Sequence, residues 1–176
     1  MLSLRPITEP SPNYIAWMND PEVIRYLETR FQVHTRESLA QYIQEQNSNS
    51  NVVLRGIFFE NAHIGNIRLG PINWVHRHAE IGLVIAKTFW GMGYGTEAIK
   101  LISDYAFDML DLHKLIAGAY NVNVGSIRAF EKAGFEIEGR IRNMYHTREG
   151  RTGRIILGKS RMVKRIIPEF TKTKEN

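Results

Sequence analysis

Three glycines at alternate positions near the middle of the chain are the residues whose spacing points most directly to chemistry. Gly91, Gly93 and Gly95 lie between an apolar segment at 80–86 and a helical pattern that begins near Ala98. Without side chains, they let the backbone approach a ligand closely and adopt positive φ angles. A strand, a glycine loop and a helix in this order present free N–H groups and a helix N-terminus, which bind anions and most often phosphate.

The residues around the last glycine separate three kinds of phosphate loop. A nucleoside-triphosphate loop requires a lysine followed by serine or threonine there, whereas this chain has Thr96-Glu97. A dinucleotide fingerprint, G-x-G-x-x-G, requires its third glycine one place later than Gly95. The third candidate is a pyrophosphate loop for coenzyme A. A glycine-rich turn without a ligand is the alternative, and the helix that follows disfavours it.

Two segments of the chain resemble the acetyl-CoA motifs of the GNAT N-acetyltransferase superfamily. The first is W-G-M-G-Y-G-T-E-A at 90–98, and the second is N-V-N-V-G-S-I-R-A-F-E-K-A-G-F at 121–135. The first resembles most closely the branch that acetylates the N-termini of ribosomal proteins. An aromatic residue at the position of Trp90 is common in that branch, whereas the general superfamily pattern has Gln or Arg there.

The resemblance implies where acetyl-CoA, the co-substrate, would bind. Its pantetheine would pair with the backbone of Val84 and Ile85, its pyrophosphate would sit on the glycine loop, and the second motif would contact the pantetheine or the phosphates. The implied binding residues are Leu83, Val84, Ile85, Trp90, Gly91, Met92, Gly93, Tyr94, Gly95, Thr96, Asn123, Ser126, Phe130 and Lys132. A neutral amine would attack the thioester directly, in agreement with a chain that lacks cysteine and a G-x-S-x-G elbow.

Two residues are candidates for the proton transfers of this reaction. Glu80 is the only acid in an otherwise apolar strand, so partial burial would suit it as the general base. The alternative is an exposed or salt-bridged glutamate at a strand edge. Many superfamily members carry a tyrosine general acid where this chain has Phe130, which cannot donate a proton. Ser126 is then the candidate acid, with a helix cap as its alternative role and solvent as an alternative proton source.

The segments on either side of the loop must position these residues. Alternation at 80–86 predicts a strand with Ile81, Leu83 and Ile85 on one face. Helical spacing after the loop predicts a helix whose core-facing residues are Ala98, Leu101, Ile102, Tyr105 and Met109.

Elsewhere the pattern predicts further strands and helices around this unit. The strands are expected at 2–7, 52–59, 63–69, 114–120, 135–144 and 154–163, and the helices at 13–27, 35–46 and 127–133. We therefore expect one α/β (α+β) domain over 1–176 with the GNAT fold, a mixed and mostly antiparallel sheet of about six or seven strands flanked by about four helices. Residues 168–176 are expected to form a flexible tail.

Composition excludes several classes of protein. The chain has 176 residues, 43% of them hydrophobic and 23% charged, which suits a single globular domain. It lacks a long apolar run and an N-terminal signal core, so a cytoplasmic location without membrane association is expected. Without cysteine or an H-E-x-x-H motif, no metal site is expected.

The net charge of +5 is concentrated between Arg140 and Arg165, where Glu149 is the single acid. Such a segment attracts phosphates or an acidic protein surface, or forms a solvated face. No nucleic-acid motif accompanies it, so direct nucleic-acid binding is not expected.

The identity of the amine acceptor is open at this level. In the superfamily the region before the second strand commonly shapes the acceptor site, and here it holds Trp17, Tyr26, Arg30 and Phe31. The acceptor is expected to be a protein N-terminal amine or a small amine such as an amino-sugar nucleotide, since the basic balance disfavours a polyamine. A CoA-binding regulatory module without transferase activity is the non-enzyme alternative. The sequence also leaves a homodimer open.

Overall fold

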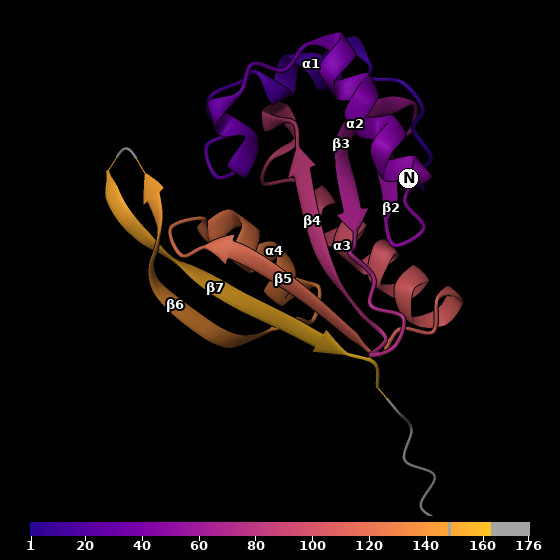
Figure 1. Cartoon of the computed structure of the whole chain (residues 1–176), viewed down its shortest axis with the longest axis vertical. Coiled ribbons are helices and arrows are strands. Elements are labelled where there is room, and N and C mark those ends of the chain that lie inside the picture. The colour runs from indigo at the N-terminus through magenta and orange to yellow at the C-terminus, as the bar shows by residue number, and fades with distance from the viewer. Residues whose placement is uncertain (148, 163–176) are drawn as a thin grey trace, which may run out of the picture.

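The computed structural model describes residues 1–147 and 149–162, and its centre is a seven-stranded sheet with the order β1-β2-β3-β4-β5-β7-β6 (Figure 1). The strands are β1 (Leu2–Arg5), β2 (Val53–Phe59), β3 (Ala62–Leu69), β4 (His78–Ile85), β5 (Lys114–Tyr120), β6 (Glu136–Thr147) and β7 (Gly150–Ser160). All neighbouring strands are antiparallel except β4 and β5, which confirms the predicted mixed sheet. The predicted tail at 168–176, Val163 at the end of the last predicted strand, and Arg148, Lys164 and Arg165 of the basic segment lie outside the described residues.

Four α-helices accompany the sheet within the described residues: α1 (Pro12–Met18), α2 (Arg36–Ser48), α3 (Tyr94–Asp104) and α4 (Val124–Lys132). Side-chain caps set the starts of α1, α2 and α4. Ser11 accepts the N–H of Tyr14 at the start of α1, and Thr35 and Ser38 form a capping box at the start of α2. Shorter helical turns are η1 (Glu28–Phe31), η2 (Lys87–Phe89) and the π-helix η3 (Tyr105–Met109).

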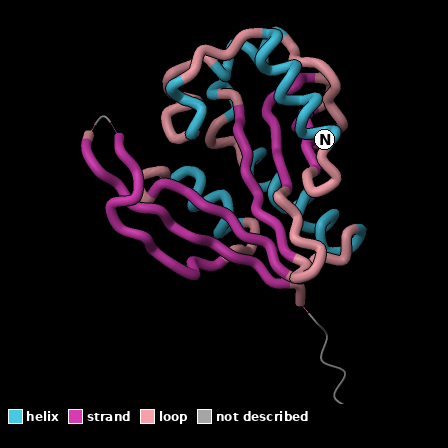
Figure 2. The backbone as a smooth tube through the Cα atoms, viewed as in Figure 1, coloured by secondary structure: helices cyan, strands magenta, loops and turns pink. Residues whose placement is uncertain are grey.

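The helices cover the sheet unevenly. Residues of α1 and α2 form one apolar core with β2, whereas α3 and α4 form a second core on the opposite face, with β5 and β7 among its strands. The helices and the two diverging halves of the sheet are visible in Figure 2. Among the described residues, no α-helix packs on the face of β5, β7 and β6 that lies opposite α4, and residues of η1 cover only the end of this face at Tyr120.

The predicted core-facing stripe of the third helix is partly wrong. Ala98 and Ile102 are buried, but Leu101 and Met109 are exposed. The residues that pack into the core instead are Ile99, Ser103, Ala106 and Phe107. The π-helical turn of η3 adds a residue to the repeat, so the spacing of a regular α-helix misplaces the residues at its end.

Strands β4 and β5 separate part of the way along their length, and this separation creates the site. They pair in parallel from His78 and Lys114 to Ile81 and Ala117, and they diverge beyond that point (Figure 1). Residues 82–85 therefore have β3 as a neighbour on one side and an opening on the other.

Backbone direction along β4 identifies the groups that face this opening. The Ala86 N–H donates to the Ile64 carbonyl of β3 at 2.8 Å, so the even-numbered residues of this segment turn their backbone groups toward β3. By alternation, the backbone groups of Leu83 and Ile85 turn toward the opening. The backbone of Val84 faces β3, so the expected pairing of pantetheine with this residue is wrong, whereas Ile85 faces the opening as expected.

Candidate active site

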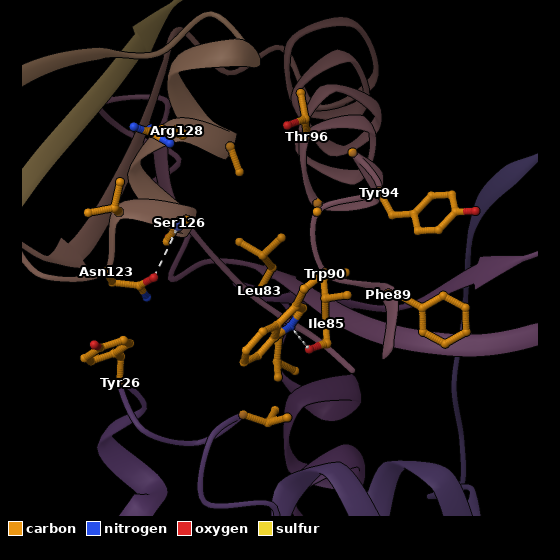
Figure 3. A pocket seen from close by; sticks show the side chains of 18 of the residues that line it. Tyr26, Leu83, Ile85, Phe89, Trp90, Tyr94, Thr96, Asn123, Ser126 and Arg128 are labelled. Carbon is orange, nitrogen blue, oxygen red and sulfur yellow. Dashed lines mark hydrogen bonds between the residues drawn. The ribbon is translucent and has the colours of Figure 1, made fainter. Parts of the chain in front are cut away.

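The opening between β4 and β5 leads into a cavity of about 960 Å³. Its wall is built from the end of β4, the glycine loop, the first turns of α3 and α4, and the segment at 22–27 (Figure 3). The structure brings most of the predicted acetyl-CoA residues together there: Leu83, Val84, Ile85, Trp90, Gly91, Gly93, Tyr94, Gly95, Thr96, Asn123, Ser126 and Lys132.

Three of the predicted site residues do not line this cavity. Met92 is exposed outside it, and Phe130 is buried in the core with its ring centroid 5.1 Å from that of Phe135. Glu80 lies on the other face of β4. The cofactor contact of Phe130 therefore has no geometric support, because α4 turns this side chain toward the sheet.

The glycine loop has the geometry of an anion site. Gly91 and Gly93 have φ angles of 76° and 85°, which favour glycine, and added Cβ atoms would meet nothing within 4 Å. Gly93 is the N-cap of α3, so no side chain occupies the first free N–H groups of the helix. Trp90 ties the loop to β4, since its Nε1–H donates to the Ile85 carbonyl at 2.7 Å (Figure 3).

Cations surround the same cavity. Arg25, Lys100, Arg128 and Lys132 line it, against the acids Glu22 and Glu97. The excess of positive charge suits the phosphates of coenzyme A. The sequence motifs do not single out Arg25, Lys100 or Arg128 as site residues. Arg128 and Lys132 are four residues apart on α4 and therefore share a helix face. This spacing could identify Arg128 as a site residue from the sequence.

The N-cap of α4 is Asn123, not Ser126. The Asn123 Oδ1 atom accepts the Ser126 N–H at 3.2 Å (Figure 3). The alternative role of Ser126 as a helix cap is therefore wrong. Its side chain lies on the cavity wall, where the role of general acid remains a prediction.

Glu80 forms an ion pair on the face of the sheet opposite α3 and α4. The Arg154 Nη2 atom donates to its Oε1 at 2.6 Å, and the glutamate side chain is 46% exposed. These contacts match the alternative to the general base, in which Glu80 is a salt-bridged glutamate. The role of Glu80 as the general base stays a prediction.

A polar and aromatic cluster lies on the same face as this ion pair. The Tyr120 hydroxyl donates to Glu28 Oε1 at 2.6 Å and accepts from Arg30 Nη1 at 2.8 Å. Burial, together with the bond to Glu28, raises the pKa of Tyr120 to about 12. The ring of Tyr145 lies 3.9 Å from that of Tyr120, and the ring of Tyr26, on the cavity wall, lies 5.6 Å from it.

Known proteins resemble this chain in both sequence and fold. A family model described as an acetyltransferase (GNAT) domain matches residues 1–136. The chain is 31% identical to the spermidine N(1)-acetyltransferase of Escherichia coli (strain K12) over 144 residues, 80% of this chain and 75% of that protein. It is 33% identical to a Bacillus subtilis (strain 168) protein provisionally named ribosomal N-acetyltransferase YdaF, over 61% of this chain and 59% of that protein.

Among solved structures, the spermidine N-acetyltransferase of Vibrio cholerae in complex with CoA and spermine aligns with a TM-score of 0.77 and 20% identity. The alignment covers 90% of this chain and 95% of that one. At this identity the likeness shows a shared fold.

These matches define an α/β acyltransferase built around a coenzyme A site. The chain belongs to the GNAT acetyltransferase family, and it is an N-acetyltransferase that uses acetyl-CoA as its co-substrate. Within the described residues, no group of three or more histidine, aspartate or glutamate side chains could hold a metal ion. None of the described helices is long and apolar enough to span a membrane.

Proposed function

We propose that the protein transfers the acetyl group of acetyl-CoA to a primary amine by direct attack within a ternary complex. The observation that carries this proposal is the separation of β4 from β5. It exposes one strand edge between two faces, with the glycine loop on one face and the Glu80–Arg154 pair on the other. The co-substrate and the acceptor would therefore approach the same edge from opposite sides.

The residues of the chain divide the chemical work between them. The free N–H groups of the first turn of α3 and the cations around the cavity would hold the phosphates. A backbone N–H of Leu83 or Ile85 would polarise the thioester carbonyl and stabilise the negative charge that develops on its oxygen. Glu80 would accept the proton that the attacking amine loses. As the C–S bond breaks, the thiolate would take a proton from Ser126 or from solvent.

The acceptor would be a protein N-terminal amine or a small amine such as an amino-sugar nucleotide. Several relatives carry names that assign them to spermidine. A polycation is favoured by an excess of acid at its site, whereas here the acids Glu28 and Glu80 are each matched by an arginine, Arg30 and Arg154. This balance supports an acceptor that carries hydrogen-bond acceptors as well as an amine.

Release of free thiol from acetyl-CoA tests the proposal. The acceptors would be peptides that begin with Ala, Ser or Met, several amino-sugar nucleotides, and spermidine. We expect release with the peptides or with the sugar nucleotides. Tight binding of acetyl-CoA without release by any amine would contradict the proposal and support a CoA-binding regulatory module instead.

A further inference from the structure

Arg154 occupies an unusual place on the acceptor face. It lies on β7 opposite Tyr120 of β5, and its side chain crosses β5 to reach Glu80 on β4. The guanidinium rests on Gly118 so closely that a Cβ added there would be 2.3 Å from Nε and Nη2. Glycine weakens the interior of a strand, so its presence at this position is explained by the room that it gives to Arg154.

The hydrogen bonds of this guanidinium are incomplete. It carries five N–H donors, and its one hydrogen-bond partner among the described residues is the Glu80 carboxylate. The Nε atom is buried without a partner, and the side chain as a whole is 24% exposed. Donors left unused in a partly buried site cost free energy. A ligand that supplies an oxygen to the exposed part of the guanidinium would recover some of it.

Open space lies next to the ion pair. Gly82 is exposed on the same face of β4 as Glu80, and a Cβ added there would meet nothing within 4 Å. Two residues further along this face, Val84 lines the cavity. The open space at Gly82 therefore lies between Glu80 of the ion pair and Val84 of the cavity that we assign to acetyl-CoA.

We propose that Arg154 binds a carbonyl oxygen next to the reacting amine, so that the preferred acceptors are α-amino carbonyl compounds, above all the N-terminus of a peptide. The inference rests on the proposed acetyl transfer. Glu80 Oε1 and Arg154 Nη2 are 2.6 Å apart. In a peptide N-terminus the amine nitrogen and the first carbonyl oxygen are about 3 Å apart. The carboxylate would receive the amine and the guanidinium would receive the oxygen.

The same geometry disfavours the other amine classes. A polyamine has no oxygen for Arg154, and the guanidinium would repel a second ammonium group at this distance. An amino sugar offers hydroxyl groups next to its amine but no carbonyl in the α position. Arg154 would thus be a specificity-determining residue, with Gly118 holding its place.

A matched pair of small acceptors tests the inference. Alaninamide and 2-aminobutane have similar size, and only the first carries a carbonyl next to the amine. We expect Arg154→Met to lower kcat/KM for alaninamide and for an Ala-initiated tripeptide about 10- to 100-fold more than for 2-aminobutane, mainly through KM, because a hydrogen bond to a charged group is lost. The ratio between the two acceptors cancels any effect on Glu80 that is common to both.

Two further variants separate geometry from charge. Gly118→Ala keeps the arginine but displaces its guanidinium, so it should reduce the preference for alaninamide as Arg154→Met does. Arg142→Met removes an exposed cation of β6 and should leave the preference unchanged. For each variant, the acetyl-CoA dissociation constant and Tm would show that the cofactor side and the fold are intact.

An equal loss for both acceptors in Arg154→Met would overturn the inference and leave Arg154 as a residue that only positions Glu80. Wild-type preference for spermidine or 2-aminobutane over alaninamide would also overturn it while leaving acetyl transfer standing. Absence of thiol release with every amine would instead contradict the proposed function, and the inference would fail with it.

Discussion

The two sides of the opening between β4 and β5 are constructed in different ways. The cavity side comes largely from two continuous stretches, at 89–100 and 122–132. The acceptor side gathers Glu28, Glu80, Tyr120 and Arg154, which are separated by long stretches of chain and meet only through the sheet and the loop before it. In the proposed mechanism, recognition of the co-substrate is encoded locally in the sequence, whereas recognition of the acceptor is encoded by tertiary structure.

Charge is also arranged differently on the two sides. Lys100, Arg128 and Lys132 line the cavity, and the described residues supply none of them with an ion-pair partner. On the acceptor side, Arg154 and Arg30 pair with glutamates. Free cations suit a ligand with several phosphates. Paired charges select a ligand by the positions of its polar groups, because the ligand must fit both charges at once.

The largest expected effect comes from filling the cavity side at Gly95. This residue lies in α3, and an added Cβ would be in ordinary contact, 3.7 Å from Leu83 and 3.9 Å from Ile85. A leucine would extend into the cavity, so we expect acetyl-CoA affinity to fall more than about 100-fold, near 3 kcal/mol. The fold should be unaffected or stabilised, because leucine is the better helix former. Calorimetry and Tm measure the two effects separately.

Gly95→Ala is the matched control and should change the affinity by only a few fold. Gly93 is a poorer probe, because its φ of 85° would strain any side chain and weaken fold and binding together. Full affinity in Gly95→Leu would show that the pyrophosphate lies elsewhere.

The second effect concerns catalysis on the acceptor side. Glu80→Gln should reduce kcat by about 10²-fold, the low end for a lost general base because water can still take the proton, while the acetyl-CoA dissociation constant stays the same. Glu138→Gln, which changes a glutamate paired with Lys114 on the same face, is the control. A wild-type rate and pH–rate profile in Glu80→Gln would exclude Glu80 as the base and leave it as the partner of Arg154.

The third effect concerns the polar and aromatic cluster around Tyr120, on the same face as the Glu80–Arg154 ion pair. Tyr120→Phe removes the hydroxyl that joins Glu28 to Arg30, so we expect a loss of about 1–2 kcal/mol in the free energy of unfolding. The acceptor KM should rise several-fold without a change in acetyl-CoA affinity. Denaturant unfolding and acceptor titration provide the measurements. Tyr105→Phe, at a half-buried tyrosine with no side-chain hydrogen bond among the described residues, is the control. Equal effects of both substitutions would show that the cluster contributes only packing.

Sequence patterns predict the cavity side better than the acceptor side, because the cavity side is built from residues that are neighbours in the chain. The glycine loop is readable because its glycines, the strand before it and the helix after it are neighbours in the chain. Strand β5 was predicted with its observed bounds, 114–120, because its apolar run is continuous. The contact of Arg154 with Glu80 depends on the register of three strands, which periodicity does not determine. The exposure of Met109 depends on a π-helical turn that α-helical spacing does not anticipate.

The smallest expected effect is a response to acid in the layer beneath α1, far from the glycine loop. His63 of β3 stacks on Phe58 with 4.7 Å between ring centroids and meets the edge of Trp17 at 5.0 Å. Its Nδ1 atom lies 3.1 Å from Ser11 Oγ, and its Nε2 atom lies 2.9 Å from Asn66 Oδ1. Burial lowers the pKa of His63 below its usual value of 6.5.

The sign of the resulting pH dependence follows from linkage. Because the folded protein holds the imidazole neutral where the unfolded chain protonates it, stability is lost as the pH falls through 6.5 toward the lower folded pKa. Between pH 7.5 and 5.5, we expect the wild-type Tm to fall about 1–3 °C further than that of His63→Gln. The acetyl-CoA affinity of the two proteins should show the same pH dependence, since the His63 ring packs against Trp17 of α1 and Phe58, whose core lies on the face of the sheet opposite α3 and α4. If the affinity changed with His63 as well, the two sides would be coupled through β3 and β4, and the separation of cofactor and acceptor recognition would fail.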